Sequence, residues 1–285
     1  TDAPLEIPFT VTKVDLVPRA IDLDTLVEDT LASAGAERHF SLSLDQQTDV
    51  FVDAIGAGST AVRWRLLDGD GNDIDGRDFN QTDGNRFAAL PLYRLAAGDY
   101  QFTVDAPDNS SGDFSFRLHD VATARQLGSS ATIDETLVPP QSTHLYRLTA
   151  SAGDKLFFDF GSFEGSAPLW RLVAPDGEVL FANNGLDVDT LTLPLDGDYL
   201  LTVEGVPEST GDAAAYDFAI FENATPAPIL LVIDAGPSPD LIVQDLAVAP
   251  TDDEINSGDQ VRVSWTTGAA FSPREIVARL TLVHT

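Results

Sequence analysis

The chain has 285 residues and a formal charge of −30, with 46 acidic side chains against 16 Lys and Arg. Such a charge repels phosphate groups, so neither nucleic acid nor an anionic membrane surface is an expected partner. The apolar fraction of 43% is that of a folded globular protein. No apolar stretch approaches the roughly 20 residues of a membrane-spanning helix, so no membrane insertion is expected. The absence of cysteine excludes disulfides, thiolate metal sites and cysteine nucleophiles.

The first predicted domain follows a lead segment, residues 1–19, and covers residues 20–125. Apolar and polar residues alternate in runs such as Phe40-Ser-Leu42 and Tyr100-Gln-Phe102, which is typical of half-buried antiparallel strands. Dipeptides that favour tight turns, such as Asp70-Gly71, separate the runs. These features predict a β-sandwich.

A second copy of this domain is predicted over residues 126–223. Trp64 aligns with Trp170 and Asp53 with Asp159, both at an offset of 106 residues (170 minus 64). Chance does not supply an ordered series of such matches, so two tandem β-sandwiches are expected. The two tryptophans occupy equivalent strand positions in period with leucines, and we interpret them as core residues rather than exposed platforms for carbohydrate.

Two motifs recur in the repeat. One is Phe40-Ser-Leu42, which returns as Tyr146-Arg-Leu148, and the other is Ala97-Gly-Asp-Tyr-Gln-Phe-Thr-Val104, which returns as Leu195-Asp-Gly-Asp-Tyr-Leu-Leu-Thr-Val203. In these motifs each copy resembles the bacterial pre-peptidase C-terminal (PPC) domain family. The resemblance implies a jelly-roll-like β-sandwich, secretion, and an accessory role beside a catalytic or adhesive region.

The composition changes after the second copy. Residues 224–237 are rich in proline, which is typical of a linker. Within residues 238–285, Pro239-Asp-Leu-Ile-Val243 and Gly258-Asp-Gln-Val-Arg-Val-Ser-Trp265 resemble the opening of a CARDB-type module, which implies an immunoglobulin-like sandwich. The segment is about half as long as the ~100 residues of such a sandwich, so it is either cut short or completes another structure. The expected fold class is all-β: two tandem jelly-roll-like sandwiches plus a partial immunoglobulin-like β segment.

One loop concentrates possible metal ligands. Calcium prefers several hard oxygen ligands from a flexible loop, and this loop offers them from Asp68, Asp70, Asn72, Asp73 and Asp75. Asp73 stands where an EF-hand loop needs glycine, so the loop is not an EF-hand. A polar hairpin turn without metal explains the same residues, since Asp176-Gly177 makes the equivalent turn with fewer carboxylates. Both a plain turn and a turn that binds calcium remain open, and calcium is the one cofactor predicted.

No catalytic or cofactor-binding residue is predicted. The four histidines do not recur at one site of the repeat, and neither His-Glu-x-x-His nor Gly-x-Ser-x-Gly occurs. We therefore expect a non-catalytic accessory, spacer or binding segment of a larger bacterial exoprotein, secreted or held at the cell surface. The alternatives are a segment of a calcium-dependent adhesin, or the C-terminal accessory region of a secreted peptidase whose catalytic residues lie on other sequence. The expected partners are other domains of the same polypeptide, and a surface polysaccharide or protein.

Overall fold

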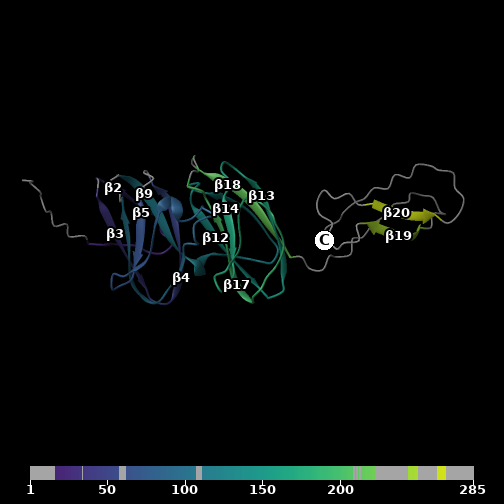
Figure 1. Cartoon of the computed structure of the whole chain (residues 1–285), viewed down its shortest axis with the longest axis horizontal. Helices are drawn as coiled ribbons and strands as arrows, with labels where there is room; N and C mark the ends of the chain where they lie inside the picture. Colours follow the sequence, from purple (N-terminus) through teal and green to yellow (C-terminus); the bar gives the residue numbers. More distant parts are fainter. Residues whose placement is uncertain are drawn as a thin grey trace, which may run out of the picture. The chain divides into compact units, whose positions relative to one another are not determined.

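The computed structural model describes residues 17–33, 35–57, 62–106, 111–207, 209, 211, 213–222, 243–249 and 262–267. The chain divides into two compact units, Thr1–Glu222 and Asn223–Thr285 (Figure 1). In the described ranges, the secondary structure is nearly all β-strand, with short 3-10 turns at η1 (Phe79–Gln81) and η2 (Val121–Thr123). The predicted all-β class is therefore confirmed. No helix in this described part is long and apolar enough to cross a bilayer.

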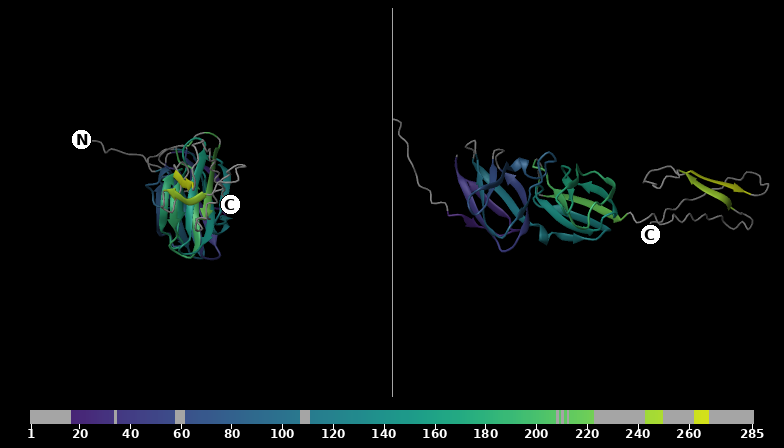
Figure 2. Two further views of the ribbon diagram at one scale, coloured as in Figure 1. Left: turned by 90° about the vertical axis from the view of Figure 1, so that its right-hand side faces the viewer. Right: turned by 60° about the horizontal axis from the view of Figure 1, so that its bottom comes forward.

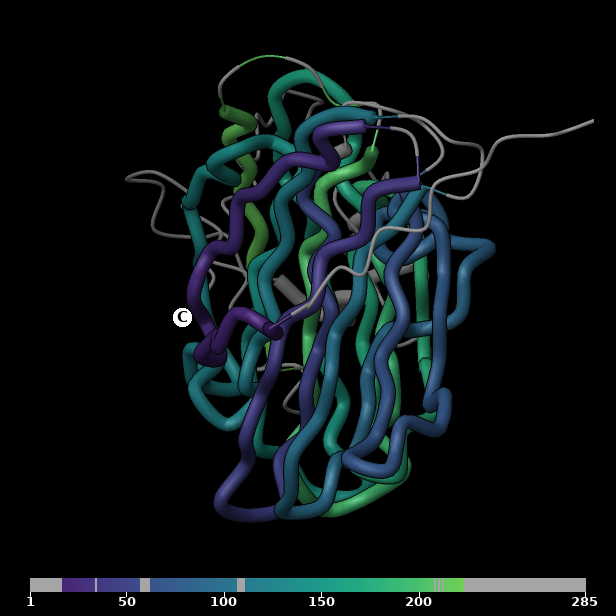
Figure 3. The backbone as a smooth tube through the Cα atoms, turned by 90° about the vertical axis from the view of Figure 1, so that its left-hand side faces the viewer, coloured from purple at the N-terminus to yellow at the C-terminus, as the bar shows by residue number. Residues whose placement is uncertain are grey.

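The first sandwich consists of two sheets of mainly antiparallel strands, which are aligned along roughly the same axis (Figure 3). Its strands are β1 (Arg19–Ala20), β2 (Val27–Leu31), β3 (Glu37–Leu44), β4 (Thr48–Ala57), β5 (Arg63–Leu67), β6 (Asp73–Asp78), β7 (Leu92–Leu95), β8 (Gly98–Asp105) and β9 (Gly112–Asp120). One sheet has the order β2-β9-β4-β7 and the other β1-β3-β8-β5-β6. Without β1, which pairs in parallel with β3, these orders are those of a jelly roll.

The second sandwich repeats this topology (Figure 2). Its strands are β10 (Arg125–Leu127), β11 (Ala131–Leu137), β12 (Thr143–Ala150), β13 (Lys155–Phe163), β14 (Leu169–Val173), β15 (Val179–Asn184), β16 (Val188–Thr192), β17 (Gly197–Glu204) and β18 (Ala214–Glu222). The sheets are β11-β18-β13-β16 and β10-β12-β17-β14-β15. The register repeats too, since Arg65 faces Thr103 in one sandwich and Arg171 faces Thr202 in the other.

Each sandwich encloses its own apolar core, to which the alternating strand positions contribute. Trp64 and Trp170 are both 0% exposed, as predicted. The Trp64 ring stacks on Phe102 with centroids 5.3 Å apart, and the Trp170 ring meets Phe160 edge-on at 4.8 Å. The large aromatic area removed from water between the two sheets is therefore a main source of stability.

The described part of the second unit is an antiparallel pair, β19 (Val243–Ala249) and β20 (Arg262–Thr267). Both strands fall in the segment for which the sequence predicts β structure. The proline-rich residues 224–237 lie outside the described residues, and the immunoglobulin-like assignment stays a prediction.

Candidate functional site

The turn with the predicted calcium ligands joins β5 to β6. Asp68 Oδ1 accepts hydrogen bonds from the backbone N–H groups of Asp70 (3.0 Å) and Asn72 (2.8 Å), and Asp68 Oδ2 accepts one from Asn72 Nδ2 (2.9 Å). The bonds from Asn72 hold the pKa of Asp68 below its ordinary value. The Asp68 carboxylate thus closes the turn through bonds within the chain, as Asp does in many turns.

The Asp75 carboxylate faces Arg77 and Tyr93 instead of the turn. Its Oδ2 lies 2.6 Å from Arg77 Nη2 and accepts a hydrogen bond from the Tyr93 hydroxyl at 2.5 Å. Burial alone raises the pKa of Asp75, but the bonds from Tyr93 and Arg77 outweigh burial, and the net effect is a lowered pKa. The Asp75 carboxylate therefore already has a cationic partner.

The structure thus brings Asp68, Asp70 and Asn72 together in one turn and places Asp75 apart from them, beside Arg77. Asp73 begins β6 and pairs with Leu67 of β5. Within the described residues, no three His, Cys, Asp or Glu side chains form a group able to hold a metal ion. Calcium binding by this turn stays a prediction.

The sequence reasoning missed the contact between the two sandwiches, which we call the junction. Phe51 of β4 is 0% exposed because it packs against Leu145, Val173 and Leu200 of the second sandwich. These three side chains lie outside the core of their own sandwich. A signal for them exists in the sequence, because β14 is buried along its whole length and reads Leu-Trp-Arg-Leu-Val with little polar alternation.

Two buried carboxyl groups, Asp53 and Asp83, lie at the junction. Asp83 accepts hydrogen bonds from Ala54 N (3.1 Å) and from Thr143 Oγ1 (2.9 Å). Asp53 Oδ2 accepts one from Thr143 N (3.2 Å) and lies 3.3 Å from His119 Nε2. Through its amide and its hydroxyl, Thr143 therefore ties the second sandwich to both carboxyl groups of the first.

The surroundings of Asp83 favour its protonated form. Burial, and then the negative charges of Asp53 and Glu204, raise the pKa of Asp83 well above its ordinary value. Asp53 Oδ1 is buried and accepts no hydrogen bond. Protonation of Asp83 removes the repulsion between the two buried acids.

His119 extends the polar cluster to the edge of the junction. Its Nδ1 lies 3.4 Å from Asp24 Oδ1, while its Nε2 faces Asp53. Burial by itself lowers the pKa of His119, but its bonds to Asp24 and Asp53 outweigh burial and raise the pKa. The His119 ring is therefore held between two carboxyl groups, which favour its charged form.

An ion pair between Arg171 and Glu204 lies in the face of the second sandwich that the first one covers. Arg171 Nε is 3.1 Å from Glu204 Oε1, and Arg171 Nη2 is 3.1 Å from Glu204 Oε2. The same guanidinium donates to Asn85 O (3.0 Å), and Gly84 N donates to Glu204 Oε2 (2.8 Å). Gly84 and Asn85 belong to the loop between η1 and β7, so the ion pair binds the backbone of the first sandwich.

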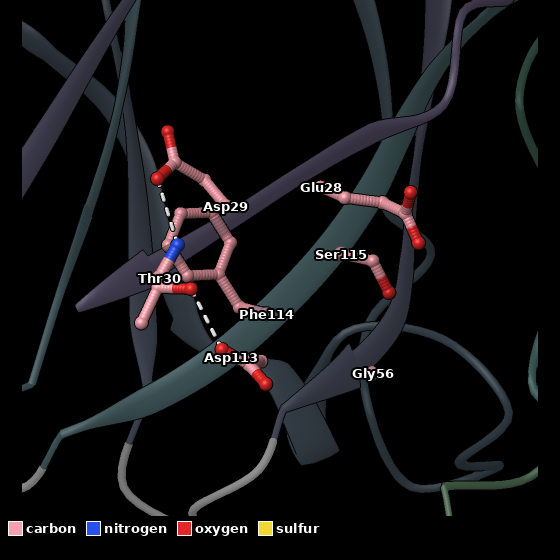
Figure 4. Close-up of a pocket in the computed structure, with 7 residues that line it drawn as sticks. All are labelled: Glu28, Asp29, Thr30, Gly56, Asp113, Phe114 and Ser115. Atoms are coloured by element: carbon pink, nitrogen blue, oxygen red, sulfur yellow. Dashed lines mark hydrogen bonds between the residues drawn. The ribbon is translucent and has the colours of Figure 1, made fainter. Parts of the chain in front are cut away.

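A groove lies on the outer face of β2 and β9 (Figure 4). Glu28 and Asp29 line it from β2, Asp113 lines it from β9, and Gly56 of β4 forms part of the wall. Thr30 Oγ1 donates to Asp113 Oδ1 at 2.6 Å, as the close-up shows. Asp29 forms an ion pair with Arg38 at 3.2 Å, while the carboxylates of Glu28 and Asp113 also line the groove.

No protein-family model matches the chain, and no curated protein matches it. Among solved structures, the chain is similar to the periplasmic inhibitor of g-type lysozyme PliG from Aeromonas hydrophila, with 19% identity and a TM-score of 0.30 over 35% of this chain and 97% of that one. PliG from Salmonella Typhimurium gives 19% identity and a TM-score of 0.28 over 35% and 100%. The CUB1-EGF-CUB2 region of human MASP-1/3 gives 7% and 0.25 over 69% and 99%. At these TM-scores the likenesses carry no functional conclusion.

Proposed function

We propose that this chain is a non-catalytic accessory segment of a larger secreted bacterial exoprotein, in which two PPC-like sandwiches act as one spacer or binding unit. The observation that carries the proposal is the junction. Contacts between the domains of one chain are usually polar and mobile, whereas this one buries Phe51 and the Arg171–Glu204 ion pair together. A fixed junction sets the distance and orientation of whatever is attached at either end.

The burial of the junction carboxyls supports the non-catalytic part of the proposal. The pKa of Asp83 is raised, as in many acid catalysts, but Asp53 and Asp83 are 0% and 2% exposed and no substrate reaches them. We expect no turnover when the purified chain is screened against proteins, polysaccharides and esters. Turnover that survives repurification and disappears on replacement of a single Asp or Glu would contradict this part of the proposal.

The Gly84→Ala variant tests the junction without altering either core. Gly84 has a φ of +63°, and a Cβ there would lie 2.2 Å from the Gly205 carbonyl oxygen of the second sandwich. Gly71→Ala is the matched control, because Gly71 also has a positive φ (+84°) but has open space around it.

We expect the two sandwiches of the wild-type chain and of Gly71→Ala to melt together in one calorimetric transition. Gly84→Ala is expected to melt the sandwiches in two separate transitions and to increase the radius of gyration in solution scattering. If the wild-type sandwiches already melt separately, or if Gly84→Ala behaves like Gly71→Ala, the two sandwiches do not act as one unit.

A further inference from the structure

The carboxyl pair of the junction has a counterpart in the second sandwich. In the first sandwich, Ala54 N donates to Asp83 Oδ1 at 3.1 Å, and at the equivalent place Phe160 N donates to Asp187 Oδ1 at 2.9 Å. Asp159, the counterpart of Asp53, is hydrogen-bonded to Asp187, and burial followed by the charge of Asp187 raises the pKa of Asp159. The repeat therefore contains both carboxyl groups of the pair in each sandwich, although Phe221 replaces the histidine beside it.

Around this second pair the surface is more apolar than at the junction and is exposed, because Phe221 pairs with Phe157 where His119 pairs with Phe51 in the first sandwich. Phe157 is the counterpart of Phe51, and its ring stacks on Phe221 with centroids 6.3 Å apart. Phe51 is 0% exposed, whereas Phe221 is 40% exposed and Leu186 64%. We call this surface the distal face; its residues are Phe157, Asp159, Leu186, Asp187 and Phe221.

The surface that covers the junction carboxyls also has a counterpart. Thr143, Arg171 and Glu204 correspond in strand register to Glu37, Arg65 and Asp105 on β3, β5 and β8 of the first sandwich. We call this outer surface the proximal face; its residues are Glu37, His39, Arg65, Leu67 and Asp105. These side chains are half-buried and remain at the surface.

The proximal face carries a positive charge that complements the negative charge of the distal face. The Glu37 carboxylate is already neutralised, because Arg65 Nη2 and His39 Nε2 each lie 3.3 Å from Glu37 Oε1. Arg65, whose side chain is 40% exposed, brings a positive charge to the contact, opposite the negative charges of Asp159 and Asp187. The backbone N–H of Glu37 has the same place in the sheet as that of Thr143, which donates to Asp53.

We propose that the distal face binds the proximal face of a second copy of this chain, and so repeats between molecules the contact that the two sandwiches make within one. The two faces differ from each other, so the contact is head-to-tail and leaves one free face at each end of any oligomer. It is weaker than the junction, because His39 and Leu67 stand where the junction has Leu145 and Val173, and because the charge of −30 on each chain opposes association. The inference does not depend on the spacer function.

Sedimentation velocity of the full chain tests the proposal, over protein concentrations from about 10 μM to about 1 mM in about 0.15 M and about 0.5 M salt, where repulsion between whole chains is screened. We expect the mean mass to rise continuously with concentration and to pass that of a dimer. Asp159→Lys reverses a charge on the distal face and Arg65→Glu reverses one on the proximal face. Each variant alone is expected to remain monomeric, because in each the altered face repels the intact face of a second copy. Asp134→Lys, at an exposed position of β11, is the control of equal charge change and is expected to associate like the wild type.

An equimolar mixture of Asp159→Lys and Arg65→Glu gives the sharpest result. The intact proximal face of the first variant binds the intact distal face of the second, and the introduced lysine and glutamate also attract each other, so the mixture is expected to associate although neither variant does so alone. A wild-type chain that stays monomeric at every concentration, a mass that stops at a dimer, or variants that associate like the wild type would each overturn the proposal. Circular dichroism spectra show whether each variant has kept its β structure.

Discussion

Arg171 and Glu204 form a buried ion pair in the face that the first sandwich covers. The distances from Nε to Oε1 and from Nη2 to Oε2 are both 3.1 Å. Their counterparts in the first sandwich, Arg65 and Asp105, lie at the protein surface. The same two positions of the repeat therefore carry charges in two different environments. Water screens one set of charges, and the neighbouring sandwich desolvates the other.

Replacing Arg171 by Met is expected to destabilise the chain by about 3–5 kcal/mol, because Glu204 would remain buried without its cation. The free energy of unfolding in urea measures the effect. Arg65→Met, the exposed counterpart, is the control and is expected to cost at most about 1 kcal/mol. Combining Arg171→Met with Glu204→Leu should recover much of the loss, since it removes the unpaired charge as well. Equal costs for Arg171→Met and Arg65→Met would contradict this view of the junction.

The stability of the junction is expected to fall as the pH rises. The raised pKa of Asp83 means that the folded chain keeps a proton that the unfolded chain releases near the ordinary value of 3.8. The free energy of unfolding therefore decreases with pH from about 4 up to the raised pKa. His119 acts in the same direction, since its raised pKa gives stability that is complete below its ordinary 6.5 and lost above it. His144, whose pKa burial lowers, acts oppositely below 6.5.

The Asp83→Asn variant isolates the first of these contributions, because Asn has the same shape and stays neutral at every pH. Its free energy of unfolding, relative to the wild type, is expected to increase between about pH 4 and about pH 8. Urea titrations of both proteins at several pH values provide the comparison. A constant difference across this range would show that Asp83 does not retain its proton on folding.

Trp64→Ala is expected to cost about 3–5 kcal/mol, because it leaves a large cavity between the sheets and removes the donor that Trp64 Nε1 presents to Thr82 Oγ1 at 2.7 Å. Trp170→Ala should cost a similar amount. Phe87→Ala is the control, since Phe87 is 83% exposed and its loss should change stability by less than about 0.5 kcal/mol. Unfolding midpoints of the three variants in urea provide the measurement, and a Trp64→Ala cost near that of Phe87→Ala would refute the core assignment.

If the turn of Asp68 binds calcium, the melting temperature of the chain is expected to rise specifically with calcium. Calcium is expected to stabilise the wild type more than magnesium or sodium at matched ionic strength, because only a specific site distinguishes among them. Asp70→Ser should abolish this difference and leave the turn intact, since Asp70 contributes its backbone N–H to the turn. If the three salts act alike on the wild type, calcium only screens the negative charge.

The strands, the repeat and the two cores follow from the sequence because each depends on local alternation. Trp64 and Trp170 are buried by the strands of their own sandwich, so their environment is predictable from neighbours along the chain. The junction could not be predicted in this way. Asp53 and Asp159 occupy equivalent positions in the two copies of the repeat, yet only Asp53 is covered by the other sandwich. What buries it is Thr143, a residue of the other sandwich whose position no local pattern specifies.

The turn of Asp68 shows a different limit of prediction from the sequence. Aspartates at alternate positions suit both a metal site and a closed turn. Only the folded structure shows that Asp68 accepts three hydrogen bonds from Asp70 and Asn72. Likewise, composition does not show that Asp75 faces Arg77. Where a carboxylate finds a partner within the chain, residue type alone leaves its role undetermined.

The connection between the sandwiches is short, since only η2 and Ala124 separate the end of β9 at Asp120 from the start of β10 at Arg125. Such a tether keeps the effective concentration of each partner in the millimolar range or above, so the closed arrangement needs only a modest intrinsic affinity. The chain can therefore place two buried carboxyl groups in this contact, at some cost in affinity, and still remain closed. Two separate molecules that meet through the equivalent surfaces have no tether, and their association depends directly on how many of them are present.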